Sequence, residues 1–139
     1  MRQFQNTLTL ETNGPGLIEF TGNVAKIVAD SGIETGLVHV FCRHTSASLL
    51  IQENADPDVR RDLEAYFSRL VRDGDSLFVH TAEGDDDMPA HIRTALTAVN
   101  LNIPLHNGRL TLGTWQGIYV WEHRRAPHSR RVAMQFIGE

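Results

Sequence analysis

Two short runs on either side of a glycine-bounded segment constrain the fold of this chain more than any other feature. The runs 110–112 and 118–120 place aliphatic side chains at every second position, which is the period of a β-strand. The segment Gly113–Gly117 between them begins and ends with glycine, the residue that permits positive φ angles and close backbone approach in a tight reversal. The sequence therefore predicts a β-hairpin about residues 113–117.

The tip of this predicted hairpin carries an aromatic and an amide side chain, Trp115 and Gln116. Such residues are poor choices for a loop that only meets water, because much of the tryptophan surface is apolar. We therefore expect the tip to lie beside His44 or His91. The alternative is a hairpin with a half-buried tryptophan and no ligand.

An acid, an imidazole and a cation follow the second run in consecutive positions, as Glu122, His123 and Arg124. Neighbouring residues of a strand face opposite sides, so Glu122 and Arg124 share one face and His123 lies on the other. The alternative to a functional role is a solvated ion pair at the surface.

Strand patterns recur along the rest of the chain. Residues 4–10 and 17–21 alternate about the turn residues 13–16 and predict a first hairpin. The β-branched and aromatic run Gly36–Cys42 predicts a buried strand. Further strands are expected at residues 77–80 and 131–137.

Three segments have the spacing of amphipathic helices. The first covers residues 23–30, with Thr21 or Asn23 as its cap and Gly32 as its stop. The second begins at Asp56 and Pro57, a cap acceptor followed by a residue suited to the first helical position.

The second helix is expected to end before Asp73, and the third to run from about Met88 to Val99. The apolar positions expected to face the core are Val59, Leu63, Phe67 and Leu70 in the second helix and Met88, Ile92, Ala95, Leu96 and Val99 in the third. Together the elements predict one compact α+β domain over residues 1–139, with a mainly antiparallel sheet or sandwich and two to three helices.

Composition excludes several classes of protein. The formal net charge of −4 argues against general nucleic-acid binding, which favours a basic surface. No apolar run approaches the roughly 20 residues of a membrane span, and residues 1–4 do not open a signal peptide. The single cysteine, Cys42, excludes an intramolecular disulfide and suits a cytoplasmic protein. A lone cysteine in an apolar run is more often a small core residue than a nucleophile.

A histidine and small hydroxyls come together in residues 44–48. If this segment is extended, His44, Ser46 and Ser48 face the same way. Hydroxyls and exposed backbone N–H groups suit the oxygens of phosphate or pyrophosphate. The alternative is an edge strand or turn with solvated side chains.

Carboxylates gather at two helix starts. Glu53 lies on the apolar face of the same extended segment, so it is a better functional candidate than Asp56, whose role as a helix cap is sufficient. Residues 83–87 place four carboxylates just before His91. Crowded carboxylates repel and need a cation, an arginine or protonation when they lose solvent.

A divalent cation fits the second group. Mg²⁺ uses one or two carboxylates plus substrate phosphates, and histidine with carboxylates also accepts Zn²⁺ or Mn²⁺. The positive end of the helix favours a neutral His91. Acidic loops at helix starts are also common without a metal. Phosphate-loop, dinucleotide and nucleophile-elbow signatures are absent.

Four motifs in this order resemble the YjbQ-like family, and the resemblance covers essentially the whole chain. They are residues 44–48, 54–59, 87–92 and 112–119, followed by the Glu122-His123-Arg124 triplet. The resemblance implies a compact α+β domain, a homotrimer with sites at subunit boundaries, and a weak secondary thiamine-phosphate synthase activity. In that reaction a thiazole phosphate attacks a pyrimidine diphosphate, with loss of pyrophosphate. Trp121 stands where similar chains can carry a cysteine, which excludes a thiol role there.

The residues and the resemblance together suggest roles for the polar groups. Loss of pyrophosphate needs the leaving charge stabilised by Mg²⁺, arginine or oriented N–H groups. We expect metal ligands among His44, His91, Asp86 and Asp87, catalytic residues among His44, His91, His123 and Glu53, and substrate contacts at Ser46, Ser48, Arg109, Trp115 and Gln116.

Two other functions use the same residues. One is a metal-dependent hydrolase of a phosphorylated metabolite, and the other is a module that binds a small anion or a metal without turnover. The seven histidines fit all three, so their number does not discriminate.

Overall fold

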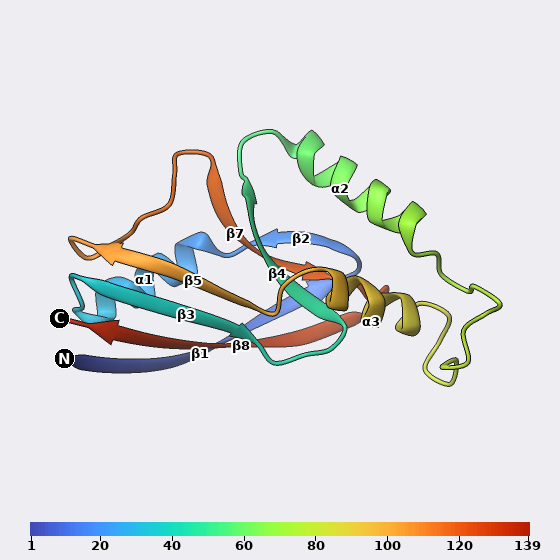
Figure 1. Cartoon of the computed structure of the whole chain (residues 1–139), viewed down its shortest axis with the longest axis horizontal. Coiled ribbons are helices and arrows are strands. Elements are labelled where there is room, and N and C mark those ends of the chain that lie inside the picture. Colours follow the sequence, from blue (N-terminus) through green and yellow to red (C-terminus); the bar gives the residue numbers. More distant parts are fainter.

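The first and last strands of the chain pair along their whole length. In the computed structural model, which describes residues 1–139, β1 (Arg2–Asn13) and β8 (Pro127–Gly138) are antiparallel, with Arg2 opposite Gly138 and Asn13 opposite Pro127. The two chain ends therefore lie side by side (Figure 1). Twelve-residue strands of this kind are long for a globular domain.

Two antiparallel sheets make up the β-structure. The larger has the order β1-β8-β3-β5-β6, with β3 (Gly36–Cys42), β5 (Asn100–His106) and β6 (Arg109–Leu110). The smaller has the order β2-β7-β4. Its strands are β2 (Gly16–Glu19), β7 (Gln116–Glu122) and β4 (Ala47–Glu53). With the three helices, this arrangement confirms the predicted α+β class.

The core lies where the two sheets and α1 (Thr21–Ser31) meet. Alternation along each strand sends every second side chain inward, and removal of this apolar surface from water is the main driving force for folding. The larger sheet contributes Val38, Val40, Val132, Met134 and Phe136, the smaller contributes Leu49, Ile118 and Val120, and α1 contributes Val24, Ile27 and Val28. Cys42 is 2% exposed within this core, as expected for a small core residue.

Both predicted hairpins are wrong, although their strands are present. β1 pairs with β8 and β2 pairs with β7, so the segment at residues 14–15 carries the chain from one sheet to the other. In the same way, β6 belongs to the larger sheet and β7 to the smaller. Alternation identifies a strand but not its partner, and the glycine-rich links allow a crossing between sheets as readily as a hairpin.

The first helix and the long strands follow the sequence closely. Helix α1 ends at Gly32, which has a left-handed φ of 64° as expected of a glycine stop. The predicted side-chain cap is absent, because Phe20 occupies the N-cap position. The Thr21 hydroxyl instead donates to Glu19 and accepts from the Ile118 N–H, and so ties α1 to β7.

Helix α2 (Pro57–Leu70) begins as predicted, with the Asp56 carboxylate accepting from the Asp58 N–H at 2.9 Å. Its predicted apolar stripe does not enter the core, since no residue of α2 is buried and Leu70 is 55% exposed. The helix lies along the surface (Figure 1). It is held where Phe67 packs edge-on against Trp121, with ring centroids 4.8 Å apart.

The strand predicted at residues 77–80 does not form. Residues 71–86 contain no helix or strand, and Leu77 and Val79 are 84% and 95% exposed. A strand needs a partner, and no other strand runs beside this segment.

Helix α3 (Asp87–Leu96) ends three residues before the predicted end at Val99 and buries a different face. The residues expected to face inward include Ala95 and Leu96, and both are exposed. The buried residues are instead Asp87, Pro89, Ala90, Arg93 and Thr94. The prediction failed because Asp87 and Arg93 are buried through polar contacts with other parts of the chain, which apolar periodicity does not register. No helix of the structure is both long and apolar enough to traverse a bilayer.

Candidate functional site

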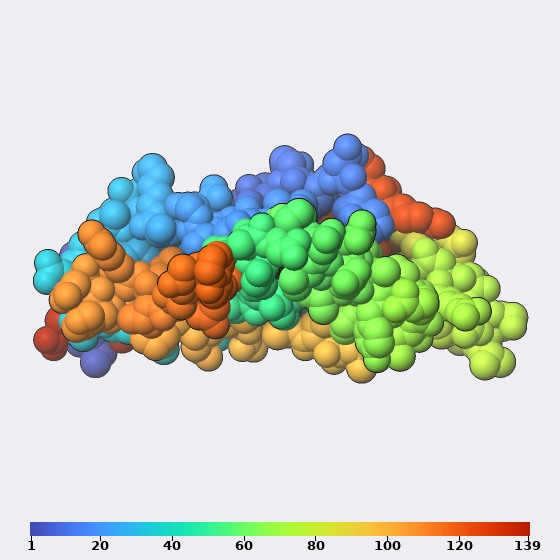
Figure 2. All heavy atoms as spheres, turned by 90° about the horizontal axis from the view of Figure 1, so that it is seen from above, coloured from blue at the N-terminus to red at the C-terminus, as the bar shows by residue number.

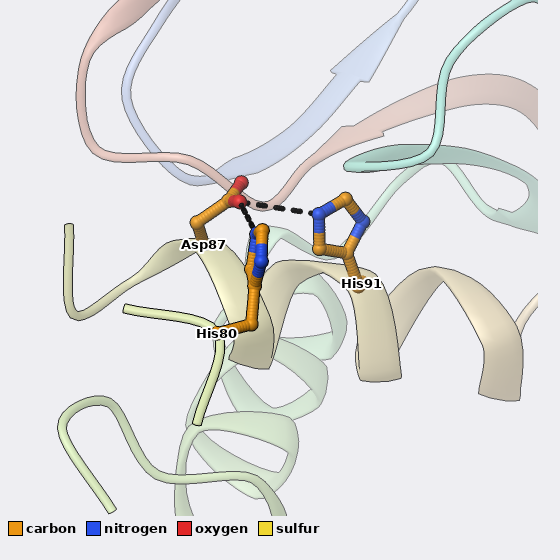
Figure 3. Close-up of side chains that lie close together, drawn as sticks. All are labelled: His80, Asp87 and His91. Carbon is orange, nitrogen blue, oxygen red and sulfur yellow. Dashed lines mark hydrogen bonds and ion pairs between the residues drawn. The ribbon is translucent and has the colours of Figure 1, made fainter. Parts of the chain in front are cut away.

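Three metal-ligand side chains converge at the start of α3. Asp87 and His91 project from successive turns of the helix, and His80 reaches them from the segment before it (Figure 3). The Asp87 Oδ2 atom lies 2.7 Å from His80 Nε2 and 3.2 Å from His91 Nε2. The three ligand atoms lie within 4.8 Å of one another. We name these three residues the His-Asp cluster.

The hydrogen bonds of His91 determine which of its two ring nitrogens carries the hydrogen. Its Nδ1 lies 2.9 Å from the carbonyl oxygen of Thr45, which can only accept, so Nδ1 carries a hydrogen. In the neutral ring, Nε2 then directs a lone pair at the Asp87 carboxylate, which also only accepts. A second proton or a cation between Nε2 and Asp87 removes this conflict.

Asp87 is buried, and its second carboxylate oxygen, Oδ1, binds an arginine. The Arg124 guanidinium donates to Asp87 Oδ1 at 2.6 Å and to Asp86 Oδ2 at 3.1 Å. The two carboxylates are 1% and 5% exposed. Burial alone would raise the pKa of each, but hydrogen bonds outweigh it and hold the pKa of both below the ordinary value. These bonds come to Asp86 from the Arg125 N–H and the Arg124 side chain. For Asp87 they come from the side chains of His80 and Glu83, and the charges of Arg124 and His91 lower its pKa further.

Arg124 is placed by the strand that precedes it. At the end of β7, the Glu122 carboxylate is fully buried and accepts from the Arg124 N–H, the Thr12 hydroxyl and the Arg130 guanidinium. Arg130 also donates to the Ser46 hydroxyl at 3.0 Å. Ser46, predicted as a substrate contact, is therefore bound to the protein's own arginine.

Ser48 and His123 form a second internal pair. The Ser48 hydroxyl and His123 Nε2 lie 2.9 Å apart, and the residues are 0% and 1% exposed. Burial, reinforced by the charges of Arg93 and Arg130, lowers the pKa of His123 to about 3. The imidazole is thus neutral at pH 7. Its enclosure favours a structural role over the predicted catalytic one.

His44 lies near His91, in a cleft that His80 does not line. Its Nε2 accepts a hydrogen bond of 2.7 Å from the Arg131 N–H. Burial, together with the charge of Arg130, lowers its pKa, so the ring is neutral at pH 7. His44, His91 and Thr94 line a cleft of about 380 Å³.

The remaining predicted residues lie at the other end of β4 and β7. Ala47 pairs with Glu122 at one end of this ladder and Glu53 with Gln116 at the other. Six residues at about 3.3 Å each separate the ends by about 20 Å. Both views of the molecule show the loop before β7 (orange) and the segment before α3 (yellow-green) far apart along the long axis (Figures 1 and 2).

Within one chain, Trp115 and Gln116 therefore lie far from His44 and His91, and the predicted proximity would require another copy in an oligomer. Trp115 is 63% exposed, and the Gln116 side chain accepts from the Gly113 N–H within the loop. Arg109 and Gln116 line a separate cavity of about 520 Å³ beside α1.

The structure changes the set of residues that fit a metal ion. Ligands about 2.0–2.1 Å from a tetrahedral Zn²⁺ are about 3.3 Å from each other, close to the 2.7 and 3.2 Å from Asp87 Oδ2 to the two histidines. Asp86 and His44, both predicted as ligands, lie outside this cluster. Asp86 Oδ2 accepts from Arg124 and the Arg125 N–H, and His44 Nε2 accepts from the Arg131 N–H. His80 was missed because residues 77–80 were interpreted as a strand. Its position seven residues before Asp87 was the available signal.

Sequence comparison places similar chains in several organisms. The family model described as UPF0047 protein YjbQ-like matches residues 6–139. The UPF0047 protein sll1880 of Synechocystis is 53% identical over 138 residues, covering 99% of this chain and 94% of its own length. YjbQ of Escherichia coli is 42% identical over 98% of this chain and 99% of its own length.

Solved structures share the fold. An uncharacterized protein of the yjbq/upf0047 family from Clostridium acetobutylicum has a TM-score of 0.85 and 37% identity, covering 95% of this chain and 99% of that one. A YbjQ-like protein of unknown function from Sulfolobus solfataricus has a TM-score of 0.90 at 23% identity and 99% coverage of both chains, which shows the fold alone. The names of these relatives state no activity.

The contacts of Arg124 predict that Arg124→Ala lowers the free energy of unfolding more than Arg125→Ala does. Arg124→Ala leaves two buried carboxylates without their main countercharge, so we expect the free energy of unfolding to fall by about 3 kcal/mol or more. Arg125→Ala removes a guanidinium that is 55% exposed and mainly paired with the exposed Asp85, so we expect a much smaller loss. Urea denaturation measures both, and equal losses would contradict the assigned role of Arg124.

Proposed function

The chain belongs to the UPF0047 protein YjbQ-like family, and from this premise we propose that it is a divalent-metal-dependent enzyme acting on a phosphorylated small molecule. The main support is the His-Asp cluster, in which two imidazole nitrogens and a carboxylate oxygen lie within 4.8 Å. Asp87 Oδ2 and His91 Nε2, the two proposed ligand atoms on α3, remain available for a metal because the other polar atom of each side chain makes a different contact. Asp87 Oδ1 binds Arg124 and His91 Nδ1 donates to Thr45.

This arrangement has the form of a supported metal site. Metal-binding histidines commonly donate their second ring nitrogen to a carbonyl or carboxylate, which fixes the tautomer and the ring orientation. The Thr45 carbonyl does so for His91, and Arg124 holds the Asp87 carboxylate in place. A bound Mg²⁺ or Zn²⁺ would supply positive charge to the phosphate oxygens of the substrate. The side chains of His80 and His91 are 45% and 30% exposed, so a ligand reaches them from solvent.

The resemblance to the family favours one reaction in particular, a weak thiamine-phosphate synthase-type transfer. The carbon–oxygen bond of the pyrimidine diphosphate breaks, and its electron pair leaves with pyrophosphate. The lone pair of the thiazole nitrogen then forms the new carbon–nitrogen bond. The chain's contribution is the His-Asp cluster, whose ligand atoms would hold the cation, and that cation would stabilise the negative charge on the leaving pyrophosphate.

The second candidate is a metal-dependent hydrolase of a phosphorylated metabolite. Solvent access to His80 and His91 favours it, because water can serve as the acceptor in place of the thiazole. In the hydrolase, water would attack phosphorus, the P–O bond to the organic part would break, and the alcohol would leave with a proton. The two reactions therefore share only the binding of the phosphate oxygens. A third possibility is a binding module that uses the same cluster without turnover.

Metal binding by the tag-free protein tests the proposal. His80→Ala and His91→Ala each remove a ligand, so we expect each to weaken Zn²⁺ binding by more than the roughly 10–100-fold that loss of an outer partner costs. Calorimetric titration measures the affinity. The thermal midpoint should stay within a few degrees, since a substitution in an exposed cleft typically costs under about 1 kcal/mol.

The matched control is His106→Ala, which removes an exposed histidine of β5 outside the cluster. It should leave the affinity for Zn²⁺ unchanged. If all three variants bind Zn²⁺ equally well, the metal site lies elsewhere. Metal binding without turnover over a panel of pyrophosphate and phosphate esters would favour the binding module.

We also propose a homotrimer with phosphorylated substrates bound at subunit boundaries, as the family resemblance implies. The exposed Tyr66 and Leu70 of α2 support self-association, because each is 55% exposed and leaves apolar surface for another copy. Sedimentation velocity at micromolar concentration should give a trimer, and a single monomer peak would contradict the proposal.

A further inference from the structure

A cleft next to the His-Asp cluster has polar groups to which the proposed chemistry gives no role. It lies between the segment after β3 and helix α3, and its volume of about 380 Å³ is in the range of small-molecule sites. Its walls include His44, Thr45, His91, Thr94 and the aliphatic Ala95 and Val99. His91 belongs to both the cleft and the cluster, so the two are continuous.

His44 presents a hydrogen-bond donor in this cleft. Its Nε2 accepts from the Arg131 N–H at 2.7 Å. That bond requires the lone pair at Nε2, and so the neutral ring carries its hydrogen on Nδ1. The Nδ1–H group makes no hydrogen bond within the chain.

Thr94 supplies a second free polar group. The residue is 8% exposed, and its hydroxyl has no hydrogen-bond partner in the protein. Buried hydroxyls nearly always have a partner, because an unpaired one loses its bonds to water without compensation. Thr97, in the same wall, differs in that its hydroxyl donates to the Arg93 carbonyl at 2.8 Å. A free buried hydroxyl on a residue that lines the cleft is therefore evidence for a ligand there.

The cleft itself contains no permanently charged side chain. Arg93 and Arg130 are paired with Asp73 and Glu122. Arg43, whose charge acts on His44, is not among the residues that line the cleft. A phosphate group would have no countercharge here, whereas a neutral group that accepts hydrogen bonds would meet two donors and aliphatic walls. The charged part of a substrate would thus bind at the His-Asp cluster, and its uncharged part in the adjoining cleft.

We infer that this cleft receives the uncharged part of the substrate, and that His44 Nδ1–H and the Thr94 hydroxyl donate to its carbonyl oxygen or ring nitrogen. Its role as a substrate subsite rests on the proposed function, because the phosphate is then held at the neighbouring His-Asp cluster. Thr94 and His44 are accordingly binding residues that select the ring or acyl portion.

NMR titration of the full chain with N-methyl-2-pyridone tests the inference, since this neutral ring carries a carbonyl acceptor and no donor. We expect saturable shifts of the backbone amides of residues 94–97. Thr94→Val keeps the side-chain shape and removes the hydroxyl, so the affinity should fall about three- to tenfold. Thr94→Ser should restore it. Thr97→Val, whose hydroxyl is already used, should bind within about twofold of the unaltered chain.

Three results would overturn the inference. They are the absence of saturable shifts, equal affinity of Thr94→Val and the unaltered chain, and stronger shifts of the same signals by inorganic phosphate or acetate. Zinc titration of the same samples separates the two proposals. Zinc binding without pyridone binding overturns the proposal that the cleft binds part of the substrate. Pyridone binding without zinc binding supports the cleft as a binding site and overturns the proposed metal centre.

Discussion

The contact on which the site depends is the one between Arg124 and the buried carboxylates of Asp86 and Asp87. One guanidinium binds both at the start of α3 and leaves Asp87 Oδ2 directed at His80 and His91. Arg124 is in turn fixed by Glu122, which is buried with Arg130 at the end of β7. Two buried carboxylates without this countercharge would raise each other's pKa and oppose folding. The His-Asp cluster is thus attached to the rigid end of a central strand.

The ladder between β4 and β7 separates the polar groups of the chain into two regions. One end carries His44, the His-Asp cluster and the cleft at Thr94, and the other carries Glu53, Trp115 and Gln116. A single chain cannot bring these ends together, because the strands are extended and about 20 Å long. A site that uses both regions requires a second copy, which is the arrangement that the family resemblance implies.

Local signals predicted the elements well and their partners poorly. The cap and proline at Asp56 and Pro57 fixed the start of α2, and Gly32 fixed the end of α1, because these signals act within one turn of helix. The two hairpins failed because strand pairing is decided by contacts far apart in the sequence, as between β1 and β8. For the same reason His80 was missed, since its approach to Asp87 depends on an irregular segment rather than on a periodic pattern. The buried face of α3 was mispredicted because Arg93 and Thr94 are buried there.

X-ray absorption at the zinc edge tests the central claim most directly, since it reports the ligands of a bound ion. Protein loaded with one equivalent of Zn²⁺ should show two imidazole nitrogens and at least one carboxylate oxygen at about 2.0–2.1 Å. His80→Ala should lose one imidazole and keep the other. A first shell without imidazole, or one that contains the sulfur of Cys42, would contradict the assignment of His80, Asp87 and His91 as the metal centre.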